Sequence, residues 1–125
     1  MITFTHRGDF GKTEKFLNGV KKIQFREILN RYGGEGVAAL RSATPKDSGL
    51  TAESWDYEVI IRRSGFSIFW TNSNLNEGVP IAILIQYGHG TRSGSFVEGR
   101  DFINPAIKPT FDKIAENLWK EVTSL

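Results

Sequence analysis

Two neighbouring runs of residues with alternating polarity constrain this chain more than any other feature. Residues 55–61 place Trp, Tyr, Val and Ile at every second position, and residues 66–70 repeat the pattern with Phe, Ile and Trp. A period of two is typical of a half-buried β-strand. Ser64 and Gly65 lie between the runs and suit a tight connection, because glycine tolerates positive φ. The sequence therefore predicts an antiparallel hairpin with one aromatic face that other elements must cover.

Two amphipathic segments are available to cover that face. Apolar residues recur at helical spacing within residues 12–43, and we expect a helix over residues 22–43, preceded by a short turn or helix. The glycines at residues 33–36 indicate a kink or a C-cap. In the C-terminal segment, apolar side chains fall on one face and charged ones on the other. Asn104 is expected to cap this second helix, with Pro105 in its first position.

These elements predict an α+β fold: a small antiparallel β-sheet flanked by a long N-terminal helix and a C-terminal amphipathic helix. At 125 residues, without a linker or an internal repeat, residues 1–125 are expected to form a single domain. Residues 1–20 are expected to form an arm that is mobile or that a partner orders. Periodicity leaves residues 81–87 open between a buried strand and a short buried helix. Glycine-rich or polar stretches are interpreted as connections; they are residues 33–36, 44–49, 72–78 and 88–95.

Several function classes are excluded by missing residue types. Cysteine is absent and only His6 and His89 are present, so thiolate zinc sites, cysteine nucleophiles and a histidine metal cage are not expected. No phosphate-binding loop, dinucleotide fingerprint or serine-hydrolase elbow occurs. We therefore expect no catalytic residue, no cofactor and no metal. The chain lacks an apolar run of about 18 residues and a secretory signal pattern, so no membrane contact is expected.

A small nucleic-acid-binding module is the alternative suggested by the distribution of charge. The net charge is only +2, but residues 1–46 carry nine Lys and Arg against four Asp and Glu, and the rest of the chain carries seven against ten. Basic residues that include Lys21, Lys22 and Arg26 could contact phosphates, and Trp55, Trp70 and Phe96 could stack on bases. Tryptophans at strand spacing are more often core residues, however. The opposite charge of the two parts also suits head-to-tail contacts between copies.

A hydrolase centred on His89 is a further alternative. Arg92, Arg100 and Asp101 lie nearby in the sequence, and a histidine in such a cluster can act as a general base. No second histidine or carboxylate cluster stands at metal-ligand spacing. A histidine between two glycines often only stabilises a loop, so we expect this cluster to be structural.

The segment 88–99 is expected to be an excursion from the compact domain. It holds four glycines, with Phe96 as a candidate exposed aromatic side chain and Arg92 as a candidate exposed charge. Loops of this length inside a compact domain are usually functional or disordered. A segment that orders on contact with a neighbouring subunit would suit an assembly protein, and a merely mobile surface loop is the alternative.

Three patches of the sequence resemble a known family. They are TPKDSGLTAESW at residues 44–55, IAILIQYGHGT at residues 81–91 and GRDFINPA at residues 99–106. In this order and spacing they resemble the tail-component family of long-tailed (siphovirus-type) phages and prophages, which contains tail-completion and head–tail joining proteins. The likeness spans about residues 20–123. Each patch can also be explained as a place where a helix ends or begins or the chain turns. Pro45, for example, disfavours a helical conformation at Thr44.

The resemblance implies a non-enzymatic structural protein of the virion, present in the host cytoplasm during assembly. It implies a homo-oligomer, a hexameric ring that docks onto tail-tube and head-connector proteins. Within the chain, contacts are expected from residues 91–99, from residues 72–78 and from the basic stretch 12–31. In a ring, that basic stretch could face DNA in the lumen and contact it without sequence preference. The residues expected to make contacts are Thr91, Arg92, Phe96, Arg100, Asn74, Asn76, Lys21, Lys22 and Arg26.

Overall fold

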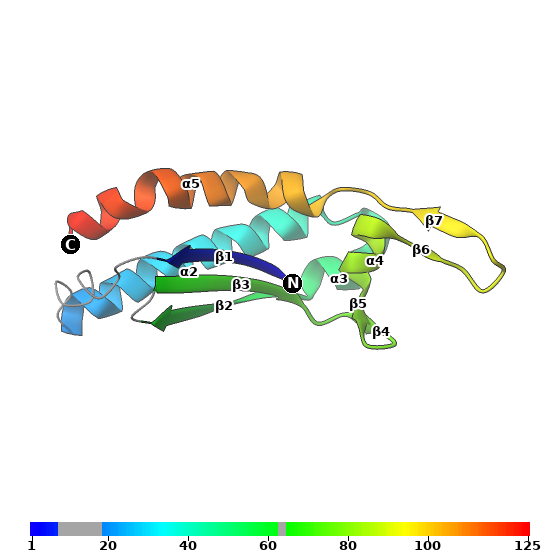
Figure 1. Ribbon diagram of the computed structural model, residues 1–125, viewed down its shortest axis with the longest axis horizontal. Coiled ribbons are helices and arrows are strands. Elements are labelled where there is room, and N and C mark those ends of the chain that lie inside the picture. The colour runs from blue at the N-terminus through cyan, green and yellow to red at the C-terminus, as the bar shows by residue number, and fades with distance from the viewer. Residues whose placement is uncertain (8–18, 63–64) are drawn as a thin grey trace.

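A computed structural model describes residues 1–7, 19–62 and 65–125 and confirms the α+β class. A three-stranded antiparallel sheet has the order β1-β3-β2, formed by β1 (Ile2–Arg7), β2 (Trp55–Arg62) and β3 (Gly65–Asn72). Helices α2 (Gly19–Ala43) and α5 (Ile103–Thr123) run alongside it (Figure 1). The shorter elements are η1 (Lys46–Ser48), α3 (Gly49–Glu53), β4 (Leu75–Asn76), β5 (Val79–Pro80), α4 (Ile81–Tyr87), β6 (Gly88–Gly90) and β7 (Phe96–Glu98).

The predicted hairpin is confirmed as β2 and β3, paired in register from Trp55 opposite Asn72 to Arg62 opposite Gly65. Strand β3 lies in the centre of the sheet. Its inward side chains, Phe66, Ile68 and Trp70, are buried against the helices. The aromatic face is therefore the core of the molecule, as the alternation of the two runs predicts.

The glycines at residues 33–36 do not end or interrupt the first long helix, because α2 continues through them to Ala43. They let the helix approach the sheet. A Cβ atom at Gly33 would lie 2.3 Å from the ring of Tyr57, and one at Gly36 would lie 2.4 Å from Nε1 of Trp70. The indole N–H of Trp70 donates a hydrogen bond to the carbonyl of Gly33 at 2.9 Å. The interpretation of these glycines as a connection is therefore wrong, and their function is close packing.

The first residues of the chain form a strand where an arm was expected. Strand β1 pairs with the free side of β3, with Ile2 opposite Trp70 and His6 opposite Phe66. Phe4 adds an edge-to-face contact with Phe111 of α5, with ring centroids 5.4 Å apart. Residues 2–7 are thus part of the core layer, and residues 19–20 of the expected arm begin α2. Residues 8–18 lie outside the described residues.

The segment left open by its periodicity, residues 81–87, is helix α4. Helix α5 begins at Ile103, two residues before Pro105, so Asn104 is not its N-cap. Gln86 of α4 takes that place from across the fold: its Oε1 accepts hydrogen bonds from the backbone N–H groups of Phe102 at 3.0 Å and Ile103 at 2.9 Å. A buried glutamine from another element therefore satisfies the first orphan donors of α5.

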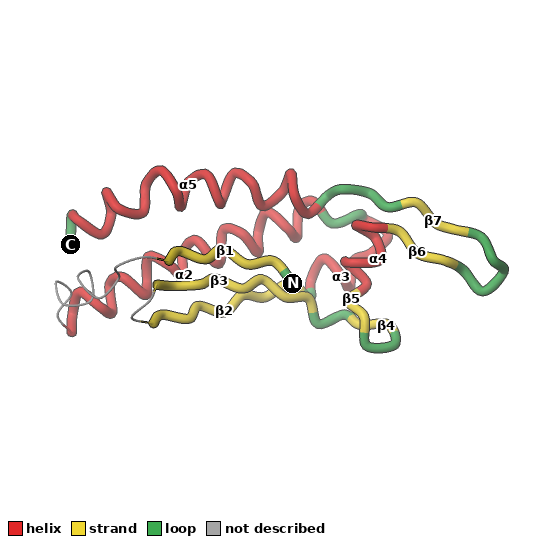
Figure 2. The backbone as a smooth tube through the Cα atoms, in the orientation of Figure 1, coloured by secondary structure: helices red, strands yellow, loops and turns green. Residues whose placement is uncertain are grey.

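The elements are laid out along one long axis. The sheet and both long helices extend along this axis, and α3, α4 and the β4–β5 hairpin gather at one end (Figure 2). From that end the β6–β7 hairpin projects beyond the body, whereas the C-terminus and the beginning of α2 lie at the opposite end (Figure 1). The shape therefore separates the candidate contact residues into two distant groups.

Candidate assembly surface

The β6–β7 hairpin is the most exposed continuous segment described, since every residue from 90 to 101 is exposed. Gly88 pairs with Glu98, His89 with Val97 and Gly90 with Phe96. Directly opposite residues of an antiparallel pair share one face. One face thus carries Phe96 and Glu98 over two glycines. Phe96 is 64% exposed although it has the largest apolar side chain of the hairpin.

The base of the hairpin is fixed to the body. Gly88 has φ 82°, and a Cβ there would lie 2.4 Å from the carbonyl oxygen of Val97, so the strands cross closely where they leave α4. The backbone N–H of Arg100 donates to the carbonyl of Ile85 at 2.8 Å. The side-chain amide of Gln86 donates to Asp101 at 2.6 Å. These bonds set the direction in which the hairpin leaves the body.

The tip of the hairpin is closed by its own hydrogen bonds. The N–H of Thr91 donates to the carbonyl of Ser95 at 2.8 Å, and the N–H of Ser95 donates to Oγ1 of Thr91 at 3.2 Å. Arg92 is exposed within this turn. The structure therefore places Thr91, Arg92 and Phe96 on the projecting hairpin and Arg100 at its base. That they make assembly contacts stays a prediction.

A small cavity of about 150 Å³ lies beside the base of the hairpin, lined by Pro45, Leu84, His89, Val97 and Arg100 among others. Nδ1 of His89 is enclosed and has no hydrogen-bond partner among the described residues. Within that part of the chain, no group of three or more His, Asp or Glu side chains could hold a metal ion. Asp101 accepts hydrogen bonds from the side-chain amides of Gln86 and Asn104 and makes none with His89. Among the described residues, no side chain is hydrogen-bonded to the imidazole of His89, and Glu98 is a further residue in the lining of the same cavity.

The two asparagines of residues 72–78 differ in their surroundings. Asn76 is exposed in the β4–β5 hairpin. Asn74 is half-buried, and its side-chain amide donates to Oγ1 of Thr51 at 2.9 Å. Beside it, Asn72 donates to the carbonyl of Thr51 at 2.8 Å. Asn74 therefore ties the β3–β4 connection to α3, and only Asn76 presents its side chain to solvent.

Additional apolar side chains are exposed at the same end of the molecule, and the sequence did not single them out. Tyr87 is 68% exposed. It ends the segment 81–87, whose strand or helix character the sequence leaves open. In the helix that forms, Ala82 and Gln86 define the buried face, and Tyr87 lies off it. The four-residue spacing of Ala82 and Gln86 would have indicated that Tyr87 is exposed if the segment had been taken as a helix. The other exposed apolar residues at this end are Leu50, Leu75, Val79 and Val97.

The basic candidates lie at the opposite end, in the first turns of α2 (Figure 1). Lys21 is half-buried and Lys22 is exposed. Arg26 reaches across β2, where its guanidinium donates to the carbonyl of Val59 at 3.5 Å. The structure therefore does not bring the basic residues to the hairpin, and the expected contact of the basic stretch with DNA stays a prediction.

Comparison with known proteins gives no match: no family model, no curated protein and no solved structure is significantly similar to this chain. Over the described ranges, none of the helices is both long and apolar enough to span a membrane. The resemblance to the tail-component family thus rests on the three sequence patches alone.

The three patches meet around the base of the hairpin. The first patch ends α2 and forms η1 and α3, the second forms α4 and β6, and the third opens α5. Gln86 of the second patch bonds Asp101, Phe102 and Ile103 of the third. Pro45 and Ser48 of the first patch line the cavity beside the hairpin. Segments far apart in the sequence thus build one platform from which the hairpin projects.

Proposed function

We propose that this protein is a structural subunit of a phage or prophage virion, a tail-completion or head–tail joining protein that acts by binding and not by catalysis. It assembles into a ring and docks onto tail-tube and head-connector proteins. It belongs to the virion, and to the host cytoplasm while particles assemble.

The projecting hairpin is the observation that carries this proposal. A single chain exposes Phe96 and Val97 on an arm with a fixed base, and four more exposed apolar side chains lie on other elements at the same end of the molecule. Apolar side chains grouped in this way on a soluble surface mark a site of protein contact. A ring subunit needs such a surface to reach its neighbour.

The convergence of the three patches also supports the proposal. The residues that resemble the tail-component family are those that hold the hairpin in its direction, through Gln86 and Gly88. If the family uses this arm for assembly, its shared residues are expected where the arm is anchored. The resemblance and the geometry therefore point to the same part of the chain.

The nucleic-acid-binding alternative is less favoured because two of its three candidate stacking residues are buried and only Phe96 is exposed. Trp55 and Trp70 lie in the core, where they cannot stack on bases. A gel-shift assay with duplex DNA at low ionic strength distinguishes a nucleic-acid-binding module from an assembly subunit. A nucleic-acid module would bind tightly with steep salt dependence, whereas the assembly subunit is expected to bind weakly or not at all outside its ring.

Deletion of the gene from an inducible prophage that encodes this chain tests the proposal. Filled heads and complete tails are expected to accumulate separately, and expression of the protein from a plasmid should restore joined particles. Electron microscopy of the lysates counts the two populations. Normal yields of joined, infectious particles without the protein would exclude this function.

A further inference from the structure

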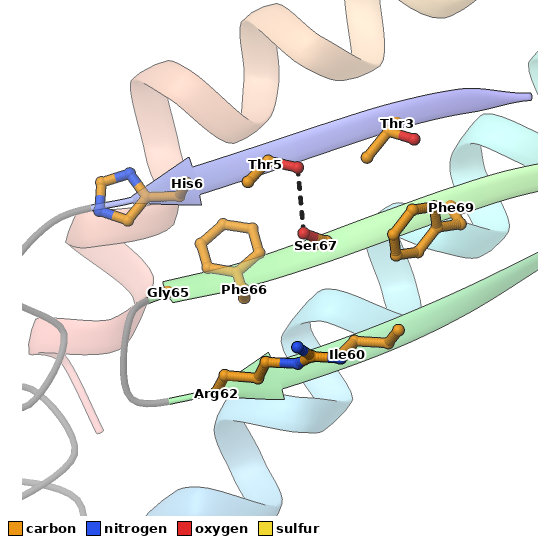
Figure 3. Close-up of a pocket in the computed structure, with 9 residues that line it drawn as sticks. All are labelled: Thr3, Thr5, His6, Ile60, Arg62, Gly65, Phe66, Ser67 and Phe69. Carbon is orange, nitrogen blue, oxygen red and sulfur yellow. Dashed lines mark hydrogen bonds between the residues drawn. The ribbon is translucent and has the colours of Figure 1, made fainter.

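The face of the sheet opposite the helices is open in the described part of the chain, since α2 and α5 both pack on the other face (Figure 2). A depression of about 380 Å³ lies on the open face (Figure 3). Its floor and rim are built by side chains from all three strands: Thr3, Thr5, Ile60, Arg62, Ser67 and Phe69. Its volume falls within the range of about 300–1,000 Å³ that is usual for binding sites.

The chemistry of the depression is apolar in one part and positive in another. Ile60 and Phe69 are half-buried, so part of each apolar surface is still in contact with solvent. Arg62 stands two residues beyond Ile60 on the same strand face and is exposed. In the described part of the chain Arg62 forms no ion pair. An occupant that fits would carry an apolar side chain and, one strand period away, a negative charge.

The hairpin carries this combination. Phe96 and Glu98 lie two residues apart on one face of β7. Both are exposed, and Glu98, like Arg62, forms no ion pair with any described residue. Residues two apart on a strand are separated by about 6.6 Å, so the Phe96–Glu98 spacing matches the Ile60–Arg62 spacing. The hairpin and the depression thus carry complementary side chains, apolar against apolar and negative against positive, at the same spacing along a strand.

A chain cannot fill its own depression. Arg62 and Gly65 mark the end of the sheet at which β2 turns into β3, whereas the hairpin projects from the other end of the long axis (Figure 1). The complementary surfaces can meet only between two molecules. Because they are different surfaces, the contact is heterologous, and a heterologous contact generates closed rings when its rotation closes.

We propose that the β6–β7 hairpin of one copy docks on the open sheet face of the next copy, with Phe96 against Ile60 and Phe69 and with Glu98 paired to Arg62. This inference rests on the proposed function, for which it names the two surfaces that join the ring. Exposed aromatic side chains that fill a pocket on the partner are the usual centre of such contacts, and the ion pair fixes their register.

Cysteine cross-linking in assembled particles tests the contact directly, because the natural chain has no cysteine. Gly90 lies opposite Phe96 and has room for a side chain, so Gly90→Cys combined with Ser67→Cys places one thiol on each surface. A short bismaleimide is expected to give a ladder of two, three and more linked copies. The matched control, Gly90→Cys with Asn117→Cys on the exposed side of α5, is expected to stay monomeric.

Three results are informative. A ladder only in the Gly90/Ser67 variant supports the contact. Particles that contain the protein but give no ladder, or that link it to a different protein, overturn the contact and leave the proposed function intact. Particles that join normally without the protein contradict both proposals.

An exchange of charges provides a second test that does not depend on a reagent. Arg62→Glu and Glu98→Arg each place like charges opposite one another and are expected to lower the yield of joined particles by about tenfold. The double variant restores the pair and is expected to recover the yield to within about twofold. Unfolding curves of the purified variants show that each one folds. Equal losses in the single and double variants would overturn the pairing.

Discussion

Single positions without a side chain decide how closely the main helix approaches the sheet. Gly33 and Gly36 face Tyr57 and Trp70 at distances that no Cβ atom tolerates, whereas Gly34 lies on the exposed side of the same helix with nothing within 4 Å. Of these three glycines, Gly33 and Gly36 are required for the close packing of the helix on the sheet, and Gly34 is not. Their number in the sequence suggests a break in the helix, and only their contacts show which of them the fold requires.

Substitution of these glycines gives opposite effects on stability. Gly36→Ala forces Trp70 to move and is expected to lower the free energy of unfolding by about 1–3 kcal/mol. Gly34→Ala, its matched control, is expected to raise it by about 0.5–1 kcal/mol, because alanine favours the helix. Urea denaturation of both variants measures the difference. Equal effects would mean that α2 does not pack on Trp70 as described.

The cap of α5 is the second prediction at this scale. Gln86→Ala leaves the N–H groups of Phe102 and Ile103 without acceptors in a buried site and is expected to cost about 2–4 kcal/mol. Asn104→Ala removes the residue that the sequence suggested as the cap, and is expected to change stability by less than about 0.5 kcal/mol. Thermal unfolding of the two variants decides which residue caps the helix. A larger loss for Asn104→Ala would contradict the structure.

At the scale of elements, a small polar cluster joins the middle of helix α2 to the C-terminal end of α5. Glu121 of α5 accepts hydrogen bonds from the hydroxyl of Tyr32 at 2.7 Å and from the guanidinium of Arg31. Burial raises the pKa of Tyr32 to about 12, and the bond to Glu121 adds to this. Burial alone would raise the pKa of Glu121 too, but the bonds from Tyr32 and Arg31 and the Arg31 charge outweigh it and hold that pKa below its usual value.

This cluster makes the stability depend on pH in the acid range. Because the folded-state pKa of Glu121 is lowered, its contribution is present above about pH 4.3, the usual unfolded value, and is lost as the pH falls through the folded-state pKa. Glu121→Gln is expected to cost about 1 kcal/mol at pH 7, since the cluster is partly exposed. The difference from the natural protein should shrink towards pH 3.

Asp112→Asn is the control for that experiment. It breaks an exposed ion pair with Lys108 on the same helix and is expected to change stability by less than about 0.5 kcal/mol at pH 7. Urea unfolding between pH 3 and pH 7 measures all three proteins. A Glu121→Gln effect that is the same at every pH would contradict the proposed role of the carboxylate.

Elements with a strong local period could be predicted from the sequence, and contacts between distant elements could not. Alternation identified β2 and β3, and helical spacing identified the two long helices. Strand β1 was missed although Ile2 and Phe4 alternate with threonines, because six residues are a weak signal and their partners on β3 lie 58 to 68 positions away in the sequence. The cap by Gln86 has no local signal, since the acceptor and the donors belong to different helices.

The whole molecule is an elongated body with an anchored arm at one end, and this arrangement separates the predicted contact residues. Thr91, Arg92 and Phe96 gather on the arm, where glycines and an aromatic residue in a polar loop had suggested an assembly contact. Asn74 is used by the fold. The open sheet face could not be predicted as a contact surface because most of its residues are the polar half of an alternating pattern, which ordinarily only meets water; Ile60 and Phe69 are the exceptions.

Removal of one aromatic ring from the arm tests the central claim most directly. Phe96→Ser changes an exposed residue, so the unfolding temperature of the purified protein is expected to stay within about 2 °C of the natural value. In prophage lysates, the fraction of heads joined to tails, counted by electron microscopy, is expected to fall at least about tenfold. Ala115→Ser, an exposed change on α5, should leave it unaltered. A folded Phe96→Ser protein that still joins heads to tails normally would contradict the account.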